Sequence, residues 1–238
     1  MNITIVGTGK AGSSFATALA GAGHDVRLIH HDELDSLGQP DLVLLAVPDD
    51  SIEAIAEQIP HSAQYVVAHV AGSRGLGELA GHERVGSMHP LAALPSPEVG
   101  AERLHGALFS VAGDELMSDV VSSLKGRAIH LSDEQRVRYH ATASVAANHL
   151  VALLGHVQVL AESAGLSLED FLPLAQQALD DVAAMGARGA LTGPASRADM
   201  ATIDAHLDSI PESERSTYVA LANAAFVLAE QRRLTSHS

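Results

Sequence analysis

The stretch NITIVGTGKAGSSFATALAGAGHDVRLI, residues 2–29, decides the fold. Residues 2–6 form a short β run, residues 10–22 have the Ala, Leu and Phe spacing of a helix, and residues 26–29 form a second β run. Glycines after the helical spacing supply its stop. The stretch therefore predicts a βαβ unit with a glycine-rich turn between its first strand and its helix.

That turn reads GTGKAG and has the spacing GxGxxG. In this setting Gly7 permits the tight turn, Gly9 lets the backbone approach a pyrophosphate, and Gly12 lets the helix pack close to the strand. We expect Gly7, Gly9, Lys10, Ala11 and Gly12 to contact a dinucleotide. The alternative is a glycine turn that serves packing alone.

The end of the second strand bears on the choice between NAD and NADP. Asp32 lies 25 positions after Gly7, a spacing that suits a carboxylate at the ribose hydroxyls of NAD. His30 and His31 compete for the same place, and a histidine there could accept the 2′-phosphate of NADP. An exposed turn without a ligand is the third possibility. NADP is the expected cofactor, with NAD as the alternative.

The segment after that strand is short. Only eleven residues, 30–40, separate residue 29 from the apolar run that begins at residue 41. The usual helix and edge strand would need roughly two dozen residues. We expect at most a single helical turn here and no edge strand, so the adenine side of a cofactor site would lose much of its wall.

Strand and helix patterns alternate up to residue 131, which predicts a doubly wound parallel sheet of the Rossmann type. The run DLVLLAV, residues 41–47, is continuously apolar after its first residue, as in strands buried on both faces of a sheet, and Pro48 ends it. Further strands are expected at residues 65–70, 84–87, 108–112 and 127–131, and further helices at residues 51–58 and 114–125.

From residue 132 onward the β patterns cease. Ser132 and Gln135 form a plausible capping box, which opens a helix that could run to residue 163. Further helices are expected at residues 168–185, 196–207 and 213–233. We therefore predict an α/β protein of two domains, with a dinucleotide-binding domain at residues 1–131 and an all-helical substrate or dimerisation domain at residues 132–238.

Composition excludes several kinds of partner. The chain has 14 Lys and Arg against 29 Asp and Glu, a net charge of −15, which repels phosphate backbones and anionic lipid surfaces. With no Cys there is neither a disulfide framework nor a thiolate site. The first residues show no charged leader region, and the chain shows no apolar run of about 18 residues. We expect a cytoplasmic protein that binds a small molecule, without nucleic acid or membrane partners.

The long helix offers a candidate catalytic face. His140, Ser144 and Asn148 follow one another at four-residue intervals, which places them within about an 80° sector of a regular helix. A proton donor, a hydroxyl and an amide could bind and protonate a carbonyl or imine during hydride delivery. The alternative is that these groups satisfy backbone carbonyls.

Loops that follow strands supply further candidates, because ligands of open α/β sheets bind outside the carboxyl ends of the strands. Val47 and Pro48 would lie beside a nicotinamide. HVAGS places His69 and Ser73 at one strand end, and GSMHPL places His89 at another. Each histidine could equally be structural. The histidines are scattered without a metal-binding spacing, so no metal is expected.

The segment GALTGPASRAD, residues 189–199, adds two candidates from the helical half. Thr192 could contact a substrate, and Arg197 could clamp a carboxylate with both ends of its guanidinium. Asp199 could equally hold Arg197 in an ion pair.

Six segments together resemble a known family. They are GTGKAG, DLVLLAVPDD, HVAGS, GSMHPL, YHATASVAANHLVAL and GALTGPASRAD, in that order. The chain resembles the Rossmann-like oxidoreductases whose C-terminal half is a domain of unknown function, within the superfamily of 6-phosphogluconate dehydrogenase, pyrroline-5-carboxylate reductase and ketopantoate reductase. The helical motifs are more specific than the glycine loop.

The resemblance implies an NAD(P)H-dependent reductase, commonly one that uses NADPH, and a helical domain that often completes a homodimer. It also suggests a small 2-oxo acid as substrate, with ketopantoate as the best single guess. The ketopantoate reductase pattern uses a lysine between the domains, but this chain has only Lys10 and Lys125, so His140 would have to supply the proton. An imine reductase and a ligand-binding protein without cofactor are the competing readings.

Overall fold

The computed structural model describes residues 1–235 and divides into two compact units, Met1–Ala147 and the residues from Asn148 onward. The boundary between the units, after Ala147, lies further along the chain than the expected domain boundary after residue 131. The reason is that the first helix after residue 131 is anchored to the sheet. Each unit is described by itself.

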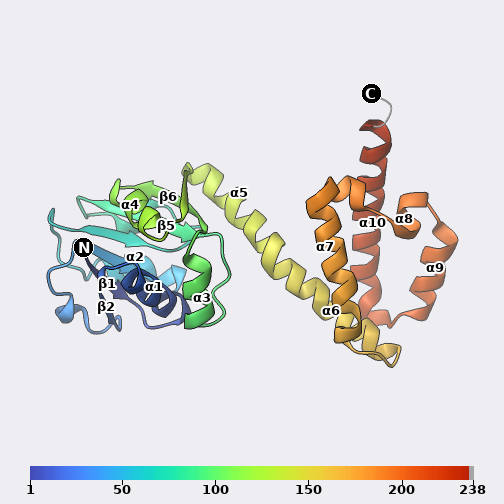
Figure 1. Cartoon of the computed structure of the whole chain (residues 1–238), viewed down its shortest axis with the longest axis horizontal. Coiled ribbons are helices and arrows are strands. Elements are labelled where there is room, and N and C mark those ends of the chain that lie inside the picture. The colour runs from blue at the N-terminus through green and yellow to red at the C-terminus, as the bar shows by residue number, and fades with distance from the viewer. Residues whose placement is uncertain (236–238) are drawn as a thin grey trace. The chain divides into compact units, whose positions relative to one another are not determined.

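The first unit is built on a seven-stranded sheet with the order β2-β1-β3-β4-β5-β6-β7 (Figure 1). The strands are β1 (Asn2–Val6), β2 (Asp25–Ile29), β3 (Leu42–Leu45), β4 (Val66–His69), β5 (Val85–Pro90), β6 (Leu108–Gly113) and β7 (Arg127–His130). All neighbours are parallel except β5 and β6, which are antiparallel. The prediction of a doubly wound, Rossmann-type parallel sheet is confirmed, and the pair of β5 and β6 is its one exception among the described strands.

Helices cover both faces of the sheet, as the side chains of its strands require. Leu42 and Leu44 of β3 enter one core cluster with α1 (Lys10–Gly21), α3 (Pro97–Leu104) and α4 (Leu116–Ser123). Val43 and Leu45 enter the other cluster, with α2 (Ile52–Ala56). Successive strand side chains point to opposite faces, so a strand buried on both sides must be apolar throughout. Helices α1 and α3 pack side by side (Figure 1).

The α3 helix was missed by the sequence analysis. Its signals are nevertheless local: Ser96 caps it by accepting a hydrogen bond from the backbone N–H of Val99, and Pro97 occupies the first turn. Eight residues contain too few apolar positions to show a helical period, so the spacing does not distinguish such a helix from a loop.

Residues 30–40 contain only one short 3-10 turn, η1 (Leu34–Ser36), and β2 forms the edge of the sheet. The expected loss of the outer strand and its helix is therefore confirmed. Leu37 closes the gap by packing into the core, while its carbonyl oxygen accepts a hydrogen bond of 2.8 Å from the Thr4 hydroxyl. The sheet thus ends where the adenine side of a full dinucleotide fold would continue.

The long helix expected from residue 132 is present. Ser132 and Gln135 form the capping box of α5 (Asp133–Ser144), a π-helical turn, η4, follows at Val145–His149, and α6 runs over Leu150–Ser163. By length and composition, residues 134–163 could cross a membrane. That is weak evidence of a span, because core helices of soluble proteins meet the same criterion.

The second unit continues with α7 (Leu168–Ala190), α8 (Gly193–Arg197), α9 (Met200–Ser209) and α10 (Glu212–Thr235). Two expected helices differ in detail. The first extends past a kink at Gly186, whose φ is 73°. The helix expected at residues 196–207 is broken at Ala198, which has a φ of 55°, and Asp199 caps a new helix through the backbone N–H of Thr202.

Candidate functional site

The glycine loop joins β1 to α1, and its three glycines have different surroundings. Gly7 has a φ of 116°, and a Cβ there would clash with the carbonyl oxygen of Ala46. A Cβ on Gly12 would overlap the carbonyl oxygen of Gly7. Beside Gly9 there is open space, with no heavy atom within 4 Å. Packing therefore explains Gly7 and Gly12, whereas open space leaves Gly9 free for the approach of a ligand.

The start of α1 presents its backbone N–H groups without competition. Gly9 caps the helix without a side-chain hydrogen bond, and the first turn has no acidic residue. Lys10 in that turn is exposed. Unpaired N–H groups at a helix start favour a negative ligand such as a phosphate. The loop residues thus fit the pyrophosphate of a dinucleotide.

The residues after β2 form a small cluster of their own. The rings of His30 and His31 lie 4.1 Å apart between centroids. His30 Nδ1 lies 2.6 Å from a carboxylate oxygen of Asp32, and this hydrogen bond is the main cause that lowers the pKa of Asp32. Because Asp32 is engaged by His30, it is less available to ribose hydroxyls than the spacing alone suggested.

A cavity of about 240 Å³ opens at the carboxyl ends of the central strands. Ala11 of the glycine loop and Val47 after β3 line it, as do His89 of β5 and His140 of α5. Its full lining is Ala11, Phe15, Ala46, Val47, Asp49, Val70, Ala71, Gly72, His89, Pro90, Ala92, Leu94 and His140. The glycine loop and two of the expected histidines therefore share one cavity.

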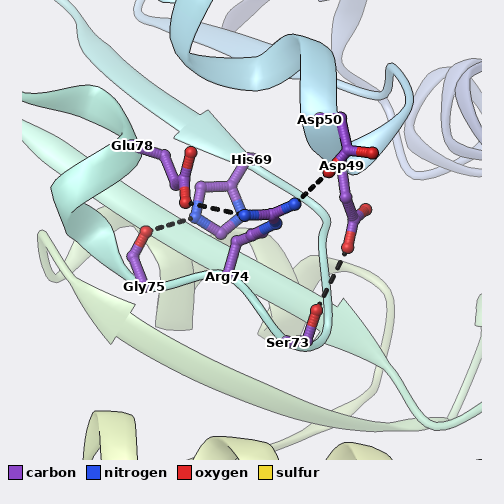
Figure 2. Close-up of polar contacts among 7 residues, drawn as sticks. All are labelled: Asp49, Asp50, His69, Ser73, Arg74, Gly75 and Glu78. Atoms are coloured by element: carbon purple, nitrogen blue, oxygen red, sulfur yellow. Dashed lines mark hydrogen bonds and ion pairs between the residues drawn. The ribbon is translucent and has the colours of Figure 1, made fainter.

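The loops after β3 and β4 are tied together beside this cavity (Figure 2). The Ser73 hydroxyl donates a hydrogen bond of 3.2 Å to Asp49, and the guanidinium of Arg74 binds the carboxylate of Asp50. His69, the last residue of β4, bonds the carbonyl oxygen of Gly75 through Nε2 at 3.1 Å. These contacts fix the backbone on either side of residue 72.

Two of the histidines meet over Gly72. The rings of His89 and His140 lie 5.5 Å apart between centroids, with planes inclined at 76°. A Cβ on Gly72 would overlap His140 Nδ1 and lie 2.8 Å from His89 Nε2. Only a glycine leaves room for both imidazoles at this point.

Burial sets the protonation of His89. Its pKa is lowered from 6.5 to about 4, mainly by desolvation; the charges of His140 and Arg136 contribute to this decrease, and Asp49 opposes it. Desolvation likewise lowers the pKa of His69. His89 is therefore neutral at ordinary pH, so it can accept or donate a hydrogen bond but does not serve as a general acid.

Arg136, which the sequence did not reveal as a site residue, lies close enough to His69 and His89 for its charge to lower the pKa of both. It is fully buried, and its Nη2 donates a hydrogen bond of 2.9 Å to the Ser87 hydroxyl. It precedes His140 by four residues, so both lie on one face of α5. That spacing was a usable signal. An arginine in a polar helical turn is nevertheless usually solvent-exposed, and nothing else in the sequence indicated burial.

Asp49 and Tyr139 were also missed. Asp49 lines the cavity, and the charge of its carboxylate raises the pKa of His89, against the larger effect of burial. The Tyr139 ring packs edge-on against His89, with centroids 5.8 Å apart. The expected Pro48 is exposed at the start of the loop that holds Asp49.

The face proposed for His140, Ser144 and Asn148 is only partly regular. Ser144 is the last residue of α5, and Asn148 lies in the π-helical turn and in the second unit. A π turn adds a residue to the helical period. The constant step of 100° per residue therefore holds only as far as Ser144, and a joint role for Asn148 stays a prediction.

Thr192 and Arg197 belong to the second unit. Both are exposed, and Thr192 lines a cavity of about 330 Å³ there. Asp199 is engaged in capping α9, and among residues 1–235 no ion pair joins it to Arg197. The same residues contain no group of three or more His, Asp or Glu placed to bind a metal ion.

Comparisons with known proteins support the fold. Residues 109–225 match the family model described as a domain of unknown function, DUF2520. No curated protein is significantly similar in sequence to this chain.

Several solved structures are similar over nearly the whole chain. A proposed NADP oxidoreductase from Bacteroides fragilis is 18% identical, with a TM-score of 0.79 over 94% of this chain and 97% of the other. A protein from Thermotoga maritima is 20% identical, with a TM-score of 0.76 over 97% and 99%. A Plasmodium falciparum pyrroline carboxylate reductase with NADP bound is 13% identical, with a TM-score of 0.61 over 96% and 98%.

Proposed function

We propose that this protein is an NADPH-dependent reductase of a small molecule with a C=O or C=N bond. The observation that carries the proposal is the shared cavity, which Ala11 of the glycine loop lines together with His89 and His140. A cofactor phosphate at the glycine loop and a proton donor beside the same cavity are what a reductase needs. The likeness to a pyrroline carboxylate reductase with NADP bound supports it.

Three groups of residues would hold different parts of the cofactor. The open space at Gly9 and the N–H groups of α1 suit the pyrophosphate. His30 and His31 suit the 2′-phosphate of NADP better than a free ribose, because His30 already occupies Asp32. Val47 lines the cavity and Pro48 follows it in the sequence, and both would contact the nicotinamide.

When bound, the reduced nicotinamide supplies a hydride to the carbon of the substrate double bond. The electron pair of that bond moves to the heteroatom, which takes a proton from His140. Ser144, four residues along α5, would orient the substrate, and His89 lines the cavity. His69 and Ser73, which lie outside the cavity lining, are also proposed substrate contacts. Asn148, Thr192 and Arg197 of the second unit are further proposed substrate contacts.

The substrate double bond is either the imine of a pyrroline-type compound or the carbonyl of a 2-oxo acid such as ketopantoate. Among the described residues, Asp49 lines the cavity of the first unit and neither Lys nor Arg does. A carboxylate neighbour would stabilise the protonated imine that forms when His140 gives its proton to the imine nitrogen, whereas the carboxylate of a 2-oxo acid would need a cationic partner. The cavity lining therefore favours the imine as the first substrate to test.

The cofactor proposal is tested by titrating the full chain with NADPH and with NADH by calorimetry. We expect NADPH to bind more tightly than NADH. Gly9→Val should weaken NADPH binding at least tenfold without changing the melting temperature, because the added side chain would fill open space that the pyrophosphate needs. Gly21→Ala, at another open position in the same unit, is the matched control. Absence of binding of either nucleotide at millimolar concentration would contradict the proposal.

The substrate is tested by following oxidation of NADPH with a cyclic imine and with ketopantoate. His140→Ala should lower turnover of either compound at least 100-fold at neutral pH, since general acid catalysis typically contributes two to four orders of magnitude. Full turnover by the variant would remove His140 from the mechanism.

A homodimer is also part of this proposal. Among the described residues of the second unit, only Ala161, Ala195, Ile203 and Ala229 are buried apolar residues. Many large apolar residues of the same helices are exposed. A second copy of the chain would cover them.

A further inference from the structure

Helices α6, α8, α9 and α10 of the second unit line a cavity of about 330 Å³, here called the helical cavity. Most of its wall is apolar, and Ala195 and Ile203 in that wall are buried. The polar side chains of its lining are those of His156, Thr192 and Tyr218. An apolar wall that carries a few polar groups, around a volume of this order, is typical of sites that bind small molecules.

His156 is held in place by a short hydrogen bond. Its side chain is 8% exposed, and Nδ1 lies 2.6 Å from a carboxylate oxygen of Glu214, whose side chain is 17% exposed. This hydrogen bond is the main cause that lowers the pKa of Glu214, so the carboxylate is ionised at neutral pH. Because an ionised carboxylate can only accept, Nδ1 carries the hydrogen of the bond. The contact therefore fixes both the tautomer and the orientation of the ring.

The second ring nitrogen of His156, Nε2, is left for a ligand. Among residues 1–235 it makes no hydrogen bond. Glu214 lines an adjoining cavity of about 420 Å³ and not the helical cavity, whereas His156 lines both. The part of the ring that remains for the helical cavity is the part away from Glu214, which carries Nε2. With Nδ1 as the donor, the neutral imidazole presents Nε2 as an acceptor.

The two hydroxyl groups of the helical cavity are secondary to His156. The Tyr218 hydroxyl lies 2.7 Å from Nδ1 of His206 and is engaged there. Thr192 is exposed, so water competes for its hydroxyl. His156 therefore offers a ligand the hydrogen bond that is best shielded from water.

We propose that the helical cavity binds a small apolar molecule that ends in a hydroxyl or ammonium group, and that this group donates a hydrogen bond to His156 Nε2. The charge around the cavity supports a donor over a carboxylate. Glu214 is ionised beside it, and in the described part of the chain neither Lys nor Arg lines this cavity or the adjoining one. A carboxylate ligand would therefore meet a negative field without a cationic partner in the lining.

The chemistry of the ligand is tested by titrating the full chain with benzyl alcohol, benzylamine and benzoate, three probes that share a ring and differ in the polar end. Binding is followed by NMR of isotope-labelled histidine at neutral pH. We expect the alcohol and the amine to bind with dissociation constants in the millimolar range and to shift the His156 Nε2 signal, which is assigned by its loss in His156→Phe. Benzoate should bind at least tenfold more weakly. Benzoate that binds as tightly as the two donors, or no binding of either donor at tens of millimolar, would overturn the proposal.

The role of His156 is tested by His156→Phe, which keeps a ring and removes the acceptor. The affinity for benzyl alcohol should fall roughly three- to tenfold, as the loss of one hydrogen bond predicts. His149→Phe is the matched control, because His149 lines the adjoining cavity and not the helical cavity. Equal affinities in the two variants would exclude His156 as the ligand's partner.

Ala225→Leu tests the location without touching the hydrogen bond between His156 and Glu214. Ala225 lines the helical cavity, so the larger side chain should fill it and abolish binding of both donors. Ala224→Leu adds the same side chain at an exposed position of α10 outside the lining and should leave binding unchanged. Unchanged binding in Ala225→Leu would place the ligand elsewhere and contradict the proposal.

The site goes beyond the proposed reductase activity, since all these titrations contain no nicotinamide nucleotide. Failure of the chain to bind NADPH would leave the helical cavity unaffected, and failure of the probes to bind would leave the reductase proposal unaffected. If a second copy of the chain fills the helical cavity instead, neither donor will bind at concentrations at which the protein is dimeric, and the ligand site is excluded.

Discussion

At the scale of the residue, His89 makes the stability of the protein depend on pH. Its pKa is lowered from 6.5 to about 4, mainly by burial, so the unfolded chain binds a proton between these pH values that the folded chain does not. The free energy of unfolding should therefore fall as pH drops from 6.5 to 4, by up to about 3 kcal/mol from this group. His69, whose pKa burial also lowers, adds a change of the same sign.

Urea unfolding at pH 7 and pH 4.5 measures this dependence. His89→Phe keeps an aromatic ring between Tyr139 and His140 but cannot titrate, so its loss of stability over the interval should be clearly smaller than that of the unaltered chain. His105→Gln removes an exposed imidazole and serves as the control. The same acid sensitivity in all three proteins would show that burial of His89 is not the cause.

At the scale of the element, a buried hydrogen bond helps to hold α5 to the sheet. Arg136 of α5 donates to Ser87 of β5 with both side chains buried. Ser87→Ala removes an acceptor from a buried charge, which should cost about 1–3 kcal/mol of unfolding free energy. Ser122→Ala, whose exposed hydroxyl bonds only the preceding turn of its own helix, should cost less than about 1 kcal/mol. Equal losses measured by urea unfolding would contradict the anchoring role.

The elements that sequence reasoning found are those with a strong local signal. The apolar run of β3 predicted a strand buried on both faces, and the eleven residues after β2 predicted the missing edge strand. The antiparallel direction of β6 was not predictable, because an apolar strand reads the same in either direction. The π turn at Val145–His149 left no signal either, since VAANH contains neither Gly nor Pro.

Some residues of the candidate site could likewise be predicted from the sequence, and others could not. Glycines and histidines beside strand ends could be predicted because the chain path alone places them at one edge of the sheet. Arg136 could not be predicted, since its burial depends on the fit of α5 against β5. The meeting of His89 and His140 over Gly72 also depends on that fit, as it joins a strand, a loop and a helix far apart in sequence.

At the scale of the whole molecule, the apolar surface of the second unit calls for a partner. Large apolar residues are exposed along one side of α7, within a sector of about 160° at 100° per residue, namely Leu172, Leu174, Leu179, Val182 and Met185. An apolar helix face of this width is normally covered by another element. The proposed partner is a second copy of the chain, because the same helices of another copy would place apolar side chains against apolar side chains.

This predicts that the protein sediments as a dimer at micromolar concentration. Leu179→Asp combined with Val182→Asp places two charges on the exposed apolar surface of α7, and the dimer dissociation constant should rise at least 100-fold, since burial of each unpaired charge costs more than about 1.4 kcal/mol. Gln177→Glu changes an exposed polar residue of the same helix and is the matched control for charge. If the unaltered chain sediments as a monomer at this concentration, a second copy does not cover this surface, and the exposed apolar residues of α7 must meet a different partner.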